Sequence, residues 1–289
     1  MNEKFEVDRE FLFLGRTFEE YQDLFELEPA DLRRGPILDC PGGPSSFTAV
    51  ASALGASVTA VDPMYERSLD ELEAECSESV DRNMEQVREK RDLFDFDYYG
   101  SVENRGRFLR AATERFLSDY ERSPDRSVAA GLPDPPFADD EFALSLSGNL
   151  LFLYDDRLDE TFHVAAAREL ARVTGDELRV FPLASLDLER SGLVEPVVDA
   201  LRGDGRDVRF EPVDYDLRPA AEEMLVVSPR SAEWPAGAGR ELFADQRAAV
   251  RPAMGYGAAP FDHDGVPVTT TSLDAAARAS TPRSPAGPK

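Results

Sequence analysis

One segment near residue 37 restricts the possible folds more than any other. Residues 37–40 form a short apolar strand that runs into the turn Pro41-Gly42-Gly43-Pro44. An amphipathic helix is predicted directly after the turn, because apolar residues recur at intervals of three and four at Phe47, Val50, Ala51 and Leu54. A second apolar strand, 58–61, follows and ends at Asp62-Pro63. This succession predicts a β-α-β unit with parallel strands.

The same alternation continues along the chain. Further strands are predicted at 127–130, 142–147 and 178–181, with a helix at about 159–173, closed by Gly175, between the last two. Two long helices, 66–91 and 102–122, are predicted between the second and third strands. Such an insertion is a natural place for substrate-specific structure.

The last two predicted strands, 208–215 and 223–228, are separated by a short connection. That spacing favours an antiparallel hairpin, because a parallel crossover needs a dozen or more residues. The predicted fold class is therefore α/β. We expect a Rossmann-like seven-stranded sheet, mostly parallel, with an antiparallel C-terminal hairpin strand and helices on both faces.

Composition divides the chain into three parts. Residues 231–289 are expected to be mostly disordered, because Ala, Pro and Gly supply 27 of these 59 residues and periodicity is almost absent. Residues 35–230 are expected to form the α/β domain, with the helical insertion at about 66–122. Residues 1–34 are expected to form a helical segment that docks on this domain, with a role as a cofactor lid as the second interpretation.

The charge balance excludes some partners. The formal net charge is −25, and 29 of the 32 basic residues are arginines. This composition resembles that of proteins from a salt-loaded, halophilic cytoplasm, and an acidic surface for a basic partner is the alternative. Direct nucleic-acid binding is disfavoured, since phosphates would meet negative charge. No apolar run suggests a membrane span, and Cys40 and Cys76 are too few for a disulfide framework or a four-thiolate zinc site. We expect a cytoplasmic protein and no metal site.

The first β-α-β unit also predicts a ligand site. A glycine-bearing turn lets a ligand approach the backbone, and the free amides at the helix start favour electron-rich groups. Asp62 lies 23 residues after Asp39, close to the interval at which a second-strand acid accepts ribose hydroxyls. The fingerprint G-x-G-x-x-G is absent, so a dinucleotide is less favoured.

Two stretches carry a resemblance to a known family. The run from Asp39 to Phe47 (DCPGGPSSF) and the run from Val58 to Asp62 (VTAVD) resemble the opening of class I S-adenosylmethionine-dependent methyltransferases. The resemblance extends through residues 132–142, similar to the family's turn before the fourth strand, and covers the terminal hairpin. It implies an antiparallel seventh strand inside a parallel sheet.

The resemblance implies a cofactor role for each matching position. By this resemblance the loop Asp39, Cys40, Pro41, Gly42 and Gly43 would approach the methionine part of S-adenosylmethionine, with Asp39 orienting its ammonium group directly or through water. Asp62 accepts the ribose hydroxyls, and Pro63-Met64 lies beside the adenine. Ser147 and Asn149, in the run that follows the fourth strand, line the space between cofactor and substrate.

Other candidates have structural interpretations first. Cys40 is expected to be a small buried residue, and His163 a structural one. The aromatic residues Phe94, Phe96, Tyr98 and Tyr99 are expected to pack the insertion onto the sheet, with a lid over an apolar or aromatic substrate as the alternative. Tyr98, Tyr99, Asn149 and His163 are pocket candidates only, so the catalytic residues stay unassigned.

Three functions remain open at this stage. The first is a methyltransferase acting on a small-molecule or protein acceptor. The second is a catalytically silent cofactor-binding protein, motivated by Pro41 and Ser45 at two of the family's glycine positions and by Ala129-Ala130-Gly131 in place of an adenine-side acid. The third is an NAD(P)-dependent oxidoreductase, which the absent fingerprint disfavours. The sequence does not predict an oligomeric state.

Overall fold

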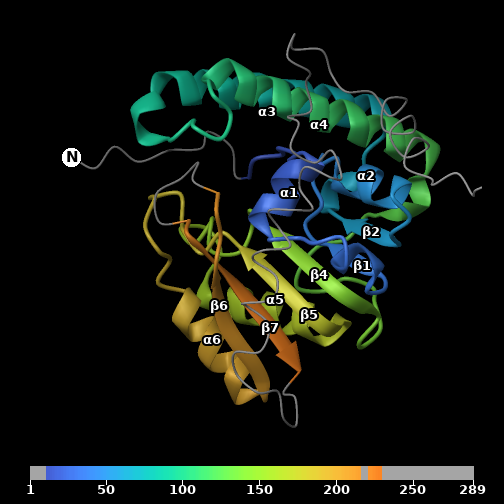
Figure 1. The fold of residues 1–289 in the computed structure, drawn as a ribbon, viewed down its shortest axis with the longest axis vertical. Coiled ribbons are helices and arrows are strands. Elements are labelled where there is room, and N and C mark those ends of the chain that lie inside the picture. Colours follow the sequence, from blue (N-terminus) through green and yellow to red (C-terminus); the bar gives the residue numbers. More distant parts are fainter. Residues whose placement is uncertain (1–10, 216–220, 230–289) are drawn as a thin grey trace, which may run out of the picture. The chain divides into compact units, whose positions relative to one another are not determined.

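A seven-stranded sheet organises the part of the chain that the computed structural model describes, residues 11–215 and 221–229 (Figure 1). The strand order is β3-β2-β1-β4-β5-β7-β6. The strands are β1 Ile37–Asp39, β2 Val58–Val61, β3 Ser127–Val128, β4 Phe142–Gly148, β5 Thr174–Phe181, β6 Arg206–Pro212 and β7 Glu223–Pro229. The expected tail lies outside the described residues and stays a prediction.

Strand directions confirm the predicted fold class. β1 to β5 pair in parallel, with β1 between β2 and β4. β7 runs antiparallel between β5 and β6, so that Leu225 lies opposite both Val180 and Phe210. The antiparallel last strand inside a parallel sheet is the arrangement that the family resemblance implies. The fold is therefore that of class I methyltransferases.

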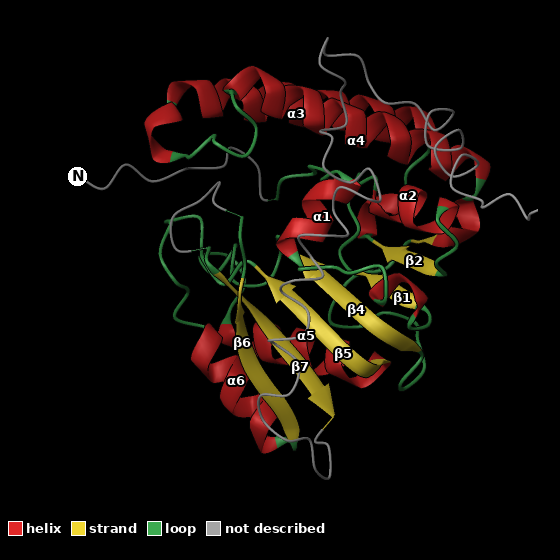
Figure 2. Cartoon of the chain, in the orientation of Figure 1, coloured by secondary structure: helices red, strands yellow, loops and turns green. Residues whose placement is uncertain are grey.

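Helices cover both faces of the sheet. Successive residues of a strand point to opposite faces, so the contacts of Leu38 and Asp39 each report on one face. Leu38 of β1 packs in one apolar cluster with α5 (Glu160–Val173) and α6 (Val194–Gly203). The next residue, Asp39, accepts a hydrogen bond from Tyr21 of α1 (Phe18–Leu24) on the other face. α2 (Phe47–Ala53) follows the turn after β1, as predicted, and Figure 2 shows it beside α1.

Two 21-residue helices, α3 (Leu69–Glu89) and α4 (Val102–Arg122), form the predicted insertion between β2 and β3. They pack against each other along one apolar stripe that includes Val80, Met84 and Leu109. A short 3-10 helix, Arg91–Leu93, and the loop 94–101 join them. No helix in the described part of the chain is long and apolar enough to cross a membrane.

The structure corrects three element boundaries. Gly175 does not close α5, because the helix passes directly into β5 at Thr174 and Gly175 lies inside that strand. β3 has two residues rather than four. β6 ends at Pro212 rather than at Tyr215: Val213 still donates its N–H to the Glu222 carbonyl, and Tyr215 contacts Tyr99 of the insertion.

Candidate functional site

The predicted cofactor residues come together at one edge of the sheet. Asp39, the last residue of β1, lies opposite Ala60 of β2 and Leu146 of β4. The segments that leave these three parallel strands therefore start side by side. They carry the glycine turn, Asp62 and the stretch from Ser147 to Asn149.

Asp62 ties the second strand to the turn after the first. One carboxylate oxygen accepts the N–H of Gly43 at 3.1 Å, and the other accepts the N–H of Met64 at 2.9 Å. The side chain is 7% exposed. Burial raises the pKa of Asp62 to about 6, although the Met64 and Gly43 amides act in the opposite direction. Asp62 thus has a structural role that its sequence position did not reveal.

The turn itself requires glycine at two successive positions. Gly43 has φ +52, a left-handed conformation that favours glycine. A Cβ atom on Gly42 would lie 2.6 Å from the Tyr65 hydroxyl and 2.8 Å from the Ala60 Cβ. The same hydroxyl donates a 2.7 Å hydrogen bond to the Gly43 carbonyl. The Tyr65 hydroxyl therefore fixes the position of the Gly43 carbonyl in the turn. The sequence analysis did not predict this contact.

Asp39 is wholly buried. Its carboxyl group accepts hydrogen bonds from the Tyr21 hydroxyl at 2.9 Å and the Ser45 hydroxyl at 3.4 Å. Burial raises its pKa to about 8, against the effect of those two donors, and the nearby Asp62 raises it further. Burial therefore favours the protonated form of Asp39 more than that of an exposed aspartate.

Residues 11–18, here named the covering segment, cross over the turn after β1. A Cβ atom on Gly15 would lie 1.9 Å from the Pro44 carbonyl oxygen, so the two backbones are in direct contact. Ser46 donates its N–H to the Arg16 carbonyl at 3.0 Å, and its hydroxyl accepts the Phe18 N–H at 3.0 Å. The Ser46 amide at the start of α2 was expected to face a ligand. Instead it donates its hydrogen bond to another residue of the chain.

A buried polar cluster anchors the covering segment. The carboxylate of Glu20, 0% exposed, accepts the Tyr99 hydroxyl at 2.5 Å and lies 3.5 Å from the guanidinium of Arg16. The Tyr99 and Tyr215 hydroxyls are 2.6 Å apart. The cluster joins α1, the α3–α4 loop and the residues that follow β6. No local sequence pattern pointed to it.

The remaining predicted site residues differ in exposure. Cys40 is 1% exposed, Pro41 and Met64 are half-buried, and Pro63 is exposed. The Ser147 hydroxyl is buried and has no hydrogen-bond partner among the described residues. Asn149 is half-buried and donates its N–H to the Phe181 carbonyl.

Of the other pocket candidates, His163 is 0% exposed. It accepts the N–H of Phe152 at 3.1 Å, which supports a structural role. Tyr98 donates to Asp23 and Tyr99 belongs to the buried polar cluster, so both hydroxyls have partners within the chain.

These residues fit S-adenosylmethionine in part. Asp62 and Ser147 fit, because a carboxylate and an unpartnered buried hydroxyl lie at the carboxyl ends of β2 and β4, the two strands that flank β1. Asp39 fits less well, since Tyr21 and Ser45 already contact its oxygens. The cavity beside Ser45 and Tyr65 holds only about 10 Å³, space for a single water at most. Among the described residues, no group of three or more His, Cys, Asp or Glu is arranged to hold a metal ion.

Comparison with solved structures finds weak likenesses, and the strand order rather than these matches supports the fold assignment. A methyltransferase from Methanosarcina mazei is 13% identical, with 70% of this chain and 98% of that chain covered and a TM-score of 0.36. A possible histamine N-methyltransferase from Thermotoga maritima is 12% identical over 74% and 95%, with a TM-score of 0.31. The [4+2]-cyclase SpnF is 14% identical over 69% and 79%, with a TM-score of 0.34.

One sequence relative is much closer. No family model matches the chain. The uncharacterized protein MJ0045 of Methanocaldococcus jannaschii is 30% identical over 220 residues, which cover 76% of this chain and 96% of that protein. The chain therefore belongs to the same family as the Methanocaldococcus jannaschii protein.

Proposed function

We propose that the protein binds S-adenosylmethionine and transfers its methyl group to a small-molecule or protein acceptor. The observation that carries the proposal is the contact between Asp62 and the glycine turn. The carboxylate of Asp62, at the end of β2, lies 3.1 Å from the amide of Gly43 after β1. The two motifs that resemble the methyltransferase family thus meet at one edge of the sheet, and the strand order supports the same function.

Each proposed binding residue has a defined task. Asp62 accepts the ribose hydroxyls, Ser147 and Asn149 line the cofactor space, and Asp39 is reached only when Tyr21 releases its hydrogen bond. The cofactor supplies an activated methyl group when bound. The protein's contribution is then to align the acceptor, which needs no fixed catalytic motif. A cytoplasmic location and the absence of nucleic-acid and membrane partners remain predictions from the sequence.

Calorimetric titration of the full chain with S-adenosylmethionine and, separately, NAD⁺ tests this proposal. We expect binding of the first only, and about 30–1,000-fold weaker binding in Asp62→Ala, because hydrogen bonds to a charged acceptor are lost. The same variant loses two backbone contacts, so circular dichroism must show that it is folded. Asp134→Ala, at an exposed position after β3, is the matched control. Unchanged affinity in folded Asp62→Ala would contradict the proposal.

A catalytically silent cofactor-binding protein is the second candidate. The covering segment favours it, because Gly15 contacts the turn directly and Tyr21 already contacts Asp39. Formation of S-adenosylhomocysteine in the presence of fractionated small molecules and proteins separates the two. Thermal stabilisation by S-adenosylmethionine without any such product supports the silent protein.

A further inference from the structure

The covering segment lies where a ligand of the glycine turn would have to lie. A Cβ atom on Gly43 would be 3.8 Å from the Leu14 carbonyl oxygen, and the backbone of Gly15 is in direct contact with that of Pro44. The cavity beside Ser45 holds only about 10 Å³, whereas small-molecule sites measure about 300–1,000 Å³. A nucleoside-sized ligand can therefore reach the turn only if the covering segment moves.

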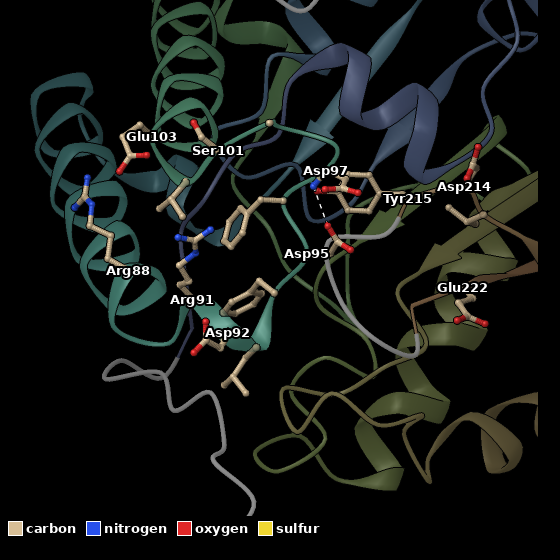
Figure 3. Close-up of a pocket in the computed structure, with 16 residues that line it drawn as sticks. Arg88, Arg91, Asp92, Asp95, Asp97, Ser101, Glu103, Asp214, Tyr215 and Glu222 are labelled. Carbon is tan, nitrogen blue, oxygen red and sulfur yellow. Dashed lines mark hydrogen bonds between the residues drawn. The ribbon is translucent and has the colours of Figure 1, made fainter.

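A larger space at this edge of the sheet lies away from the turn. A cavity of about 990 Å³, here named the open cavity, is lined by the α3–α4 loop with Asp95 and Asp97, the start of α4, residues 213–215 and Glu222 (Figure 3). The antiparallel pairing of β7 with β5 places Glu222 beside the carboxyl end of β5. No residue that the sequence analysis assigned to the cofactor lines this cavity. The lack of space is therefore a property of the turn and not of the whole edge.

The covering segment and α1 also occupy polar groups around the turn. The Ser46 amide donates to the Arg16 carbonyl at 3.0 Å, and the Ser46 hydroxyl accepts the Phe18 N–H at 3.0 Å. The Tyr21 hydroxyl, one turn further along α1, donates to Asp39 at 2.9 Å. A ligand that contacts Asp39 must replace this last hydrogen bond, so the chain competes with the ligand for the same oxygen atom.

Three consecutive side chains anchor the covering segment to the α3–α4 insertion. Leu12 and Leu14 pack against the apolar cluster that α3 and α4 share. Phe13 is 7% exposed and packs in a second cluster with Tyr65 and with Phe116 of α4. The ring centroids of Phe13 and Phe116 are 6.5 Å apart, in an edge-to-face arrangement. The covering segment thus contacts the turn through its backbone and the insertion through these side chains, and the insertion holds it in place.

We propose that the covering segment is autoinhibitory: it closes the S-adenosylmethionine site and must leave the turn after β1 before the cofactor binds. This inference rests on the proposed function. When a closed and an open conformation are in equilibrium, the apparent Kd is the intrinsic Kd divided by the fraction of open molecules. Contacts that favour the closed conformation therefore stabilise the fold and weaken cofactor binding at the same time. A purely structural segment would not produce these opposite effects.

Calorimetric titration of the full chain with S-adenosylmethionine tests the proposal. Phe13→Ala removes a buried anchor of the covering segment, so it should lower the Tm and bind the cofactor about tenfold or more tighter than the wild type. Phe142→Ala is the matched control, because this ring is 3% exposed and lies at the start of β4, the end of that strand away from the turn. It should lower the Tm as well but change the affinity less than about twofold. Leu12→Ala/Leu14→Ala loosens the same segment and should act like Phe13→Ala, which keeps the test valid if that variant does not fold.

Hydrogen exchange gives a readout that does not need the cofactor. The Ser46 amide should exchange faster in Phe13→Ala than in Phe142→Ala, because its acceptor on Arg16 moves away with the segment. Faster exchange together with unchanged or weaker cofactor binding would overturn the proposal. Exchange as slow as in the wild type in both anchor variants would also overturn it, since these contacts would then not hold the segment. Binding to none of the proteins despite faster exchange would contradict the proposed function, and with it this inference.

Discussion

Two regions at one edge of the same sheet differ in whether their acidic residues are buried or exposed. Around the turn after β1, Asp39 and Asp62 are buried, hydrogen-bonded and raised in pKa. In the open cavity, Asp95 and Asp97 are exposed. In the first region Tyr21 of α1 and Ser45 contact Asp39, and the amides of Gly43 and Met64 contact Asp62. Burial therefore raises the pKa of the two carboxyl groups in the first region, whereas Asp95 and Asp97 stay in contact with water.

Glu20→Gln should produce the largest loss of stability. Removing the charge leaves the guanidinium of Arg16, which is 7% exposed, without its counter-ion. Breaking a buried pair in this way costs about 3–5 kcal/mol in free energy of unfolding. Guanidinium chloride unfolding measures the loss. Asp204→Asn, which breaks the exposed pair with Arg168, should cost about 0–1 kcal/mol. Similar small losses in both variants would mean that the cluster does not anchor the covering segment.

Gly15→Ala should destabilise the protein through the contact with the turn. The added Cβ would lie 1.9 Å from the Pro44 carbonyl oxygen, so one backbone must shift, at a cost of about 1–3 kcal/mol or more. Gly203→Ala is the matched control, because no atom lies within 4 Å of an added Cβ at the end of α6. That variant should be neutral or slightly stabilising. Urea unfolding compares the two, and hydrogen exchange of Ser46 reports on the covering segment. An equal response of the two variants would place the covering segment away from the turn.

Asp39→Asn should change how the stability of the protein depends on pH. The folded-state pKa of Asp39, about 8, lies above its unfolded value near 4, so the folded protein binds the extra proton between these pH values. Stability from this group is complete below pH 4 and is lost as pH rises to about 8, by at most about 1.4 kcal/mol per pH unit. Relative to the wild type, Asp39→Asn should therefore gain stability from pH 5 to pH 8. Unfolding curves at constant salt test this, and a constant difference would show that Asp39 is already ionised at pH 5.

Local sequence signals were sufficient for most of the fold. The intervals between Leu72, Cys76, Val80 and Met84 indicated α3, and the described helix buries those side chains. The short spacing of the last two strands indicated their antiparallel pairing. Local signals failed at Gly175, because pairing with β4 extends β5 back to Thr174 and overrides the glycine as a helix stop.

The candidate site was predictable only in part. Asp39, Asp62 and the glycine turn follow strands, so their meeting at one edge followed from the β-α-β pattern. Their partners did not follow from it. Tyr21 lies 18 residues before Asp39 in the chain, and Tyr65 lies 22 residues after the Gly43 carbonyl that it contacts. Contacts between residues so far apart produce no periodic pattern in the sequence. The sequence analysis therefore did not predict the raised pKa of Asp39.

The sequence by itself determined the β-α-β unit, the two long helices and the hairpin, because periodicity and turn chemistry are local properties of the chain. Only the tertiary structure decided that residues 11–18 cross the turn after β1 and that Tyr215, after β6, meets Tyr99 of the α3–α4 loop. Both features join segments far apart in sequence. Their formation depends on burial and hydrogen bonding that exist only once the sheet has assembled.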